Sequence, residues 1–103
     1  MEAICHRVID AQREDGESFE LEVVMYKPFP DPREGGDWAC SFHIRGLEEE
    51  MQGVAYGIDE FQALLHCIKS IDAHLKSLQR TQHLSLSFLG LQDLGFHTNL
   101  LGA

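Results

Sequence analysis

The chain has 103 residues, of which 44% are hydrophobic and 24% are charged, and its formal net charge at pH 7 is −9. This length suits a single domain, 1–103, and leaves no room for two hydrophobic cores. The apolar runs span only a few residues, so we expect no membrane-spanning segment. The excess of acids disfavours nucleic acid as a partner. The first residues lack the basic and long apolar regions of a secretory signal, which predicts a cytoplasmic protein.

The acidic residues are concentrated in the first part of the chain. Residues 1–60 contain 15 Asp and Glu and 5 Lys and Arg, whereas residues 61–103 contain 2 and 3. Such a charge distribution attracts basic partners and repels anionic membranes. An acidic surface can also serve only to keep a protein in solution, so charge alone leaves both interpretations open.

Two segments alternate between the two faces of a strand and predict β-structure. In residues 19–26, one face carries Phe19, Leu21, Val23 and Met25, and the other carries Glu20, Glu22, Val24 and Tyr26. In residues 38–45, the core face carries Trp38, Cys40, Phe42 and Ile44, and the outer face carries Ala39, Ser41, His43 and Arg45.

Shorter strands and turns complete the first part of the chain. Residues 3–9 and 51–56 are compatible with strands, and the polar segment 11–17 contains Gly16, which suits a hairpin turn. Residues 27–37 contain three prolines and a Gly-Gly pair. We expect a long exposed loop there, because proline lacks the donor that a central strand needs.

The segment from residue 59 to residue 80 has the pattern of a helix. Asp59 is a good N-cap, and Gln62 follows three residues later, as in a capping box. The predicted apolar stripe consists of Phe61, Leu64, Leu65, Ile68, Ile71, Leu75 and Leu78. On this assignment Cys67 lies near the edge of the stripe and His66 faces mostly outward.

Residues 84–88 alternate once more and predict a last strand, after which residues 97–103 are expected to form a frayed tail. Together the patterns predict one α+β domain. An antiparallel sheet of four or five strands packs on one long helix, in the order β-β-β-β-α-β.

No motif in the sequence indicates catalysis, a metal or a cofactor. The six histidines are scattered, and the three cysteines form no CxxC or CxxH pair, so we expect reduced thiols and no zinc site. Neither His66 beside Cys67 nor Cys40 with His43 has the geometry of a nucleophile and its base. We therefore assign no catalytic residue and expect a protein that is not an enzyme.

Several motifs together resemble a known family. They read PFPDPREGGDWAC, IRG, YGIDEFQALLHCI and FLGLQDLGF. This pattern resembles a family of small uncharacterised bacterial domains and covers nearly the whole chain, as far as Phe96. The resemblance implies a single α+β domain and no particular activity. In general character the chain also resembles the immunity proteins of toxin–immunity pairs.

The remaining chemistry is surface recognition. If the acids of the outer strand row, the proline-rich loop and the turn 46–50 lie on one side, they form an acidic patch with aromatic anchors, which suits a basic protein. The candidate partner-binding residues are Glu20, Glu22, Tyr26, Phe29, Asp31, Glu34, Asp37, Glu48, Glu49 and Glu50.

The most specific hypothesis is a cytoplasmic immunity protein that covers the active site of a basic, nuclease-like toxin. One alternative is a small enzyme or ligand-binding domain with a pocket between helix and sheet near His43. Another is a self-associating domain, because Val24 makes the outer face of its strand partly apolar and suited to a homodimer.

Overall fold

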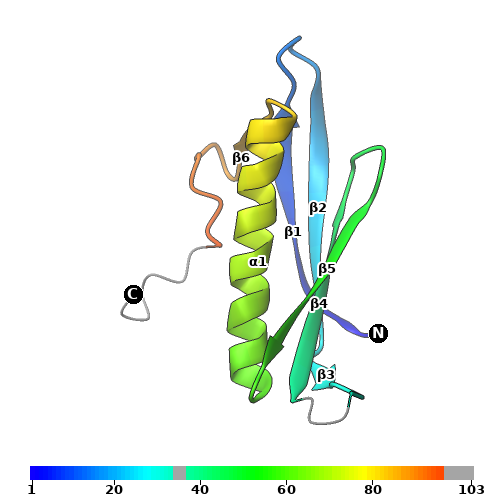
Figure 1. The fold of residues 1–103 in the computed structure, drawn as a ribbon. Helices are drawn as coiled ribbons and strands as arrows, with labels where there is room; N and C mark the ends of the chain where they lie inside the picture. Colours follow the sequence, from blue (N-terminus) through cyan, green and yellow to red (C-terminus); the bar gives the residue numbers. More distant parts are fainter. Residues whose placement is uncertain (34–36, 97–103) are drawn as a thin grey trace.

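The computed structural model describes residues 1–33 and 37–96. Figure 1 shows a twisted sheet with a helix along one of its faces. The elements are β1 (Ala3–Gln12), β2 (Ser18–Tyr26), β3 (Phe29–Pro30), β4 (Trp38–Arg45), β5 (Met51–Gly57), α1 (Glu60–Thr81) and β6 (Ser85–Ser87). The predicted tail, 97–103, lies outside the described residues.

The sheet is antiparallel and has six strands. Its main order is β5-β4-β2-β1-β6, and β3 pairs with β4 through Phe29 and Ala39. The same part of β4 also pairs with β5, so β3 lies on the opposite side and continues the line of β2. The α+β class, the antiparallel sheet and the helix are confirmed.

The predicted number and order of strands need correction. Residues 27–37 were expected to form only a loop, but Phe29 and Pro30 form a short strand within it, which gives the order β-β-β-β-β-α-β. The missing N–H of Pro30 is tolerated because β3 is only two residues long and lies at the border of the sheet.

The helix begins where its cap residue predicts. Asp59 has an extended backbone, and its side chain accepts a hydrogen bond of 2.8 Å from the backbone N–H of Gln62. The bounds Glu60–Thr81 differ by one residue at each end from the predicted 59–80. In the part of the chain that the structure describes, no helix is long and apolar enough to cross a membrane.

The buried face of α1 is rotated from the predicted stripe in its first turns, whereas Ile71, Leu75 and Leu78 are buried as predicted. Its buried residues are Ala63, Cys67, Ile71, Leu75 and Leu78. Phe61 is 78% exposed, whereas Cys67 is fully buried at the centre of the face. The reason lies at Gly57, where a Cβ atom would stand 2.3 Å from the backbone N of Ala63. The helix therefore approaches β5 so closely that only a small side chain, that of Ala63, fits against the sheet here, and the large ring of Phe61 faces solvent.

Candidate functional site

The helix covers one face of the sheet, and the other face carries a polar cluster. Strand alternation directs Val24 and Tyr26 of β2, and Ser41 of β4, to the face away from α1. All three are nevertheless buried, with exposed fractions of 8% or less. We call this face, away from α1, the open face. The hydroxyl of Ser41 lies 3.2 Å from the sulfur of Met1, so the N-terminal residue helps to cover the centre of the open face. Tyr26 is therefore not an exposed aromatic anchor.

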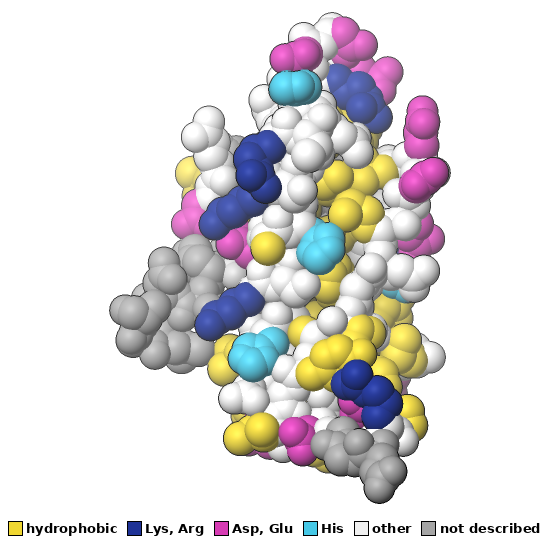
Figure 2. Space-filling view, in the orientation of Figure 1, with side chains coloured by type: hydrophobic (Ala, Val, Ile, Leu, Met, Phe, Trp, Pro, Cys, Tyr) yellow, Lys and Arg dark blue, Asp and Glu magenta, His cyan; other side chains and the backbone are white. Residues whose placement is uncertain are grey.

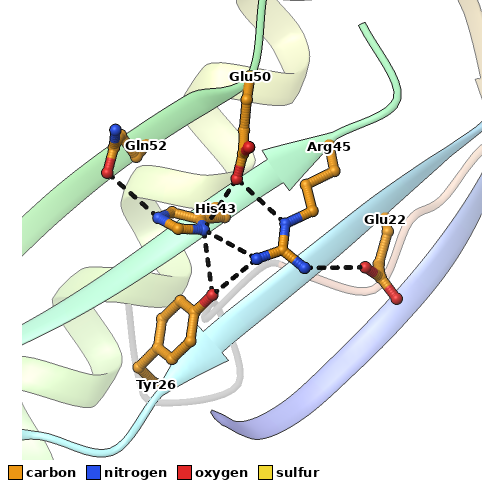
Figure 3. A network of polar contacts seen from close by, with 6 residues as sticks. All are labelled: Glu22, Tyr26, His43, Arg45, Glu50 and Gln52. Carbon is orange, nitrogen blue, oxygen red and sulfur yellow. Dashed lines mark hydrogen bonds and ion pairs between the residues drawn. The ribbon is translucent and has the colours of Figure 1, made fainter. Parts of the chain in front are cut away.

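A network of polar contacts extends across β2, β4 and β5 on this open face (Figure 3). Tyr26 Oη lies 3.0 Å from His43 Nδ1, and Arg45 Nη2 donates to Tyr26 Oη at 3.3 Å. Arg45 also donates from Nε to Glu50 at 3.0 Å and approaches Glu22 at 3.7 Å. The bond to Glu50 is the main cause that raises the pKa of the Arg45 guanidinium. Two of the predicted acids, Glu22 and Glu50, are thus joined through one arginine.

His43 can occupy this network in two protonation states. Its Nε2 lies 3.1 Å from the Gln52 side-chain oxygen, and its Nδ1 lies 2.9 Å from Glu50. An imidazolium donates from both nitrogens, one to each of these oxygens. A neutral ring with its proton on Nε2 still donates to Gln52 and accepts at Nδ1 from Tyr26 or Arg45. Among the described residues, no buried side-chain N or O atom lacks a partner. The network therefore links β2, β4 and β5 on the open face through His43 and Arg45.

A group of acids without a counter-ion gathers at one end of the molecule. This acidic end is formed by the β1–β2 turn, the neighbouring ends of both strands and the β4–β5 turn, and acidic side chains mark it in the upper part of Figure 2. Gly46 brings the two parts together, since its φ of +113° allows a turn in which a Cβ atom would stand 2.3 Å from the carbonyl oxygen of Glu20. Six acids here form no ion pair with another described residue: Asp10, Glu14, Asp15, Glu20, Glu48 and Glu49.

An open groove of about 760 Å³ crosses the acidic end on its helix side. Glu17, Glu48 and Glu49 line it, together with Thr81 and Gln82 at the end of α1. The carbonyl end of a helix carries a partial negative charge, which adds to that of the carboxylates. Arg13 also lines the groove, but it is bound to Glu17 at 3.2 Å and lies over the ring of Phe19.

The structure places the loop residues at the opposite end. Phe29 and Asp31 belong to β3 and the segment after it, at the bottom of Figure 1, far from the turn that carries Glu48. Asp37 lies beside Asp31, whose backbone N–H donates to the Asp37 carbonyl at 3.1 Å. Hydrogen bonds from Arg33 hold the pKa of Asp31 below its ordinary value. The predicted patch is thus divided between two ends; Glu34 lies outside the described residues.

The pocket predicted near His43, between helix and sheet, is not found in the described part of the molecule. His43 lies on the face away from α1. A small hollow of about 210 Å³ does separate helix and sheet, but it lies beside β1 and is lined by Cys5, Arg7, Ile68 and Phe96 among others. Arg7 closes one side of it, with its guanidinium between the rings of Phe88 and Phe96.

The three cysteines are free, as expected, and Cys40 lies in the core as its strand face predicts, but Cys67 is buried rather than at the edge of the helix stripe. The Cys40 thiol donates to the Tyr26 carbonyl at 3.4 Å. Cys40 and Cys67 are both fully buried and reduced, and their thiols interact between β4 and α1. This contact is the largest cause that raises the pKa of the Cys67 thiol, and burial adds to it. No group of three or more His, Cys, Asp or Glu residues suited to a metal ion occurs within 1–33 and 37–96.

Residues 5–98 match the family of domains of unknown function described as DUF6968. The chain belongs to this family. The coarser part of the resemblance, membership of an uncharacterised domain family, is thereby confirmed. A search of curated proteins and a search of solved structures each returned no match.

Sequence reasoning missed the Tyr26–His43–Arg45 network. Alternation alone puts these side chains on the outer faces of their strands. Their contact depends on the register of β2 against β4, in which Val24 stands opposite His43 and Glu22 opposite Arg45. The outward pair His43 and Arg45, two residues apart, was the available signal.

Proposed function

We propose that this domain is a non-enzymatic protein-binding module whose acidic end receives a basic protein. In its most specific form it is an immunity protein that neutralises a basic, nuclease-like toxin by covering the toxin's active site with carboxylates. The observation that carries the proposal is the gathering of six acids without an ion pair at one end of the molecule.

The arrangement of these acids supports a cationic partner. Asp10 of β1 stands directly opposite Glu20 of β2, and like charges at opposed positions destabilise a sheet. A lysine or arginine placed between them removes that repulsion and adds two charge-assisted hydrogen bonds. The groove lined by Glu48 and Glu49 offers a second position of the same sign. The two positions suit a basic surface rather than a single small cation.

Charge also favours fast and selective encounter with such a partner. A nuclease must carry a positive surface to hold nucleic acid, and complementary potentials raise the association rate and reject acidic competitors. Binding of this kind weakens as salt screens the charges. The remaining acids near the site, Glu22 and Glu50, are already paired with Arg45, so they set the shape of the neighbouring surface rather than its net charge.

The test is capture of partners by the tagged protein from its native lysate at low salt, followed by elution with high salt. The charge-reversal variant is E48K/E49K at the acidic end. The matched control is E2K/E60K, which makes the same change in net charge at exposed positions away from that end. We expect a basic protein to bind the wild type and the control and to be lost from E48K/E49K.

The captured protein is then assayed for cleavage of DNA and RNA, with and without the wild-type domain. Inhibition of a nuclease supports the immunity form of the proposal. A basic partner without nuclease activity supports recognition but removes the immunity form. Equal loss of binding in both variants shows that only net charge matters and refutes an acidic-end site.

A further inference from the structure

Strand β5 is one border of the sheet, and its outer edge has no strand beside it in the described residues. Its sequence, Met51 to Gly57, contains no charged residue and no proline. Proteins usually protect such edges with lysines, prolines, bulges or covering segments, because unpaired backbone groups recruit another strand. The exposed edge of β5 is therefore a candidate binding surface separate from the acidic end.

The hydrogen bonds of neighbouring residues show which backbone groups point outward. The N–H of Ile58 donates to the Gln62 side chain at 2.8 Å, and the carbonyl of Tyr56 accepts from His66 Nδ1 at 2.6 Å. Both partners are on α1 rather than β4. Since alternate residues of a strand direct both backbone groups to the same side, the outward set is Gln52, Val54, Tyr56 and Ile58.

The helix thus protects only the last part of this edge. The Tyr56 carbonyl and the Ile58 N–H are occupied by helix side chains. The outward N–H and carbonyl groups of Gln52 and Val54 remain for a further strand. The side chains of these two residues do not cover the edge, since Val54 is 42% exposed and Gln52 is also exposed.

We propose that β5 pairs with β5 of a second copy of the chain, antiparallel and about a two-fold axis at Gly53. In this register Gln52 of each copy stands opposite Val54 of the other, and each pair exchanges both of its backbone hydrogen bonds. All the free groups of Gln52 and Val54 are then used, and the groups that α1 already occupies are left alone. The two sheets become one continuous sheet.

The side chains in this register complement one another. On the face away from the helix, Glu50 stands opposite Tyr56 of the second copy. Within each copy, the guanidinium of Arg33 lies over the ring of Tyr56, 4.4 Å from the ring centre. Glu50 is already paired with Arg45, and Arg33 with Asp31, so the positions that meet at both ends of the contact bring no unpaired charges of the same sign together. On the helix side, Gly53 meets Gly53 and Met51 meets Ala55, so no two large side chains oppose each other.

If two copies of the chain associate, charge favours contact at the edge of β5 over contact at other faces. Each chain has a formal net charge of −9, so most faces of two copies repel each other. Strand β5 carries no charged residue, and it is longer than the other two uncharged strands, β3 and β6. A two-fold contact also closes after two copies and leaves no further edge of β5 exposed.

The oligomeric state tests this proposal, measured by sedimentation equilibrium from micromolar to near-millimolar concentration. Two variants address the edge. Val54→Pro removes an outward donor and Val54→Lys adds an edge charge. The matched control is Val8→Lys, because Val8 is also 42% exposed on a strand but lies in β1. Far-ultraviolet circular dichroism verifies that each variant folds. If Val54→Pro does not fold, the oligomeric state of Val54→Lys decides the test.

We expect the wild type and Val8→Lys to reach twice the chain mass of 11.7 kDa, and both Val54 variants to remain at that mass. Amide exchange of Gln52 and Val54 should slow as the wild-type concentration rises. A wild type that stays monomeric over the whole range overturns the proposal, and so does a dimer that survives both Val54 variants. E48K/E49K should leave the dimer mass unchanged, which separates this edge from the partner site.

Discussion

Substitution of Gly57 by alanine should strongly destabilise the fold. A Cβ atom at this position would stand 2.3 Å from the backbone N of Ala63, 2.7 Å from the backbone C of Gln62 and 2.9 Å from Ala63 Cα. All three atoms belong to the backbone of the first turns of α1, so no side chain can rotate away. Restoring ordinary van der Waals distance requires the helix to move by roughly 1 Å against a close-packed core.

The cost follows from that displacement. Overpacking of a well-packed site costs about 1–3 kcal/mol, and the upper end applies because the obstruction is backbone. A loss of about 3 kcal/mol is a large share of the about 5–15 kcal/mol by which such domains are stable. With a urea dependence of about 1.5 kcal/mol per molar, the unfolding midpoint should fall by about 2 M.

Gly16→Ala is the control for this experiment. Gly16 has a φ of +92° but nothing within 4 Å of an added Cβ, so its alanine variant carries only the backbone penalty of about 1–2 kcal/mol. Equilibrium urea unfolding of the two variants and the wild type gives the comparison. A Gly57→Ala protein that is as stable as the wild type, or more stable than Gly16→Ala, refutes the close approach of helix and strand.

Three further predictions concern the helix cap, a loop carboxylate and the thiols. Asp59→Ala removes the acceptor for the Gln62 N–H and should cost about 1 kcal/mol in urea unfolding, whereas the exposed neighbour Glu60→Gln should cost less. Arg33 holds the pKa of Asp31 below its ordinary 3.8, so the stabilisation of the fold by this ion pair is present above that value and is lost as pH falls through the lowered pKa. In Arg33→Ala, an NMR titration of Asp31 should show the midpoint moving up toward 3.8. An unchanged midpoint contradicts the pairing. Of the three thiols, the exposed Cys5 should react with a thiol reagent under native conditions, whereas the buried Cys40 and Cys67 should react only when the protein unfolds. Rapid labelling of Cys67 in the native protein argues against its burial.

Local patterns predicted the elements well because each pattern depends on the chain's own period. Alternation located β2 and β4, and the cap at Asp59 located the start of the helix, since both features require no knowledge of distant residues. The short strand β3 was missed because its two residues pair with β4 through a tertiary contact that overrides the signal of the prolines.

The rotation of the helix had a cause that periodicity does not contain. The apolar stripe places Phe61 on the buried side as readily as Ala63 and Cys67. The choice is made by Gly57, which admits only a small helix residue at close range. The same limit applies to the candidate site, because the joining of Glu22 and Glu50 through Arg45 depends on strand register.

The two surfaces proposed for this domain differ in the forces that hold their partners, and this difference makes them separable. At the acidic end the attraction is between unpaired carboxylates and a basic partner, so affinity falls as ionic strength rises. At the edge of β5 the attraction rests mainly on backbone hydrogen bonds and on Val54, and salt leaves these almost unchanged. Salt also screens the repulsion between two acidic chains, so it should strengthen the dimer while it releases the basic partner. Opposite salt dependences of the two associations are therefore the signature expected of a chain with a group of unpaired acids at one end and an uncharged strand at the border of the sheet.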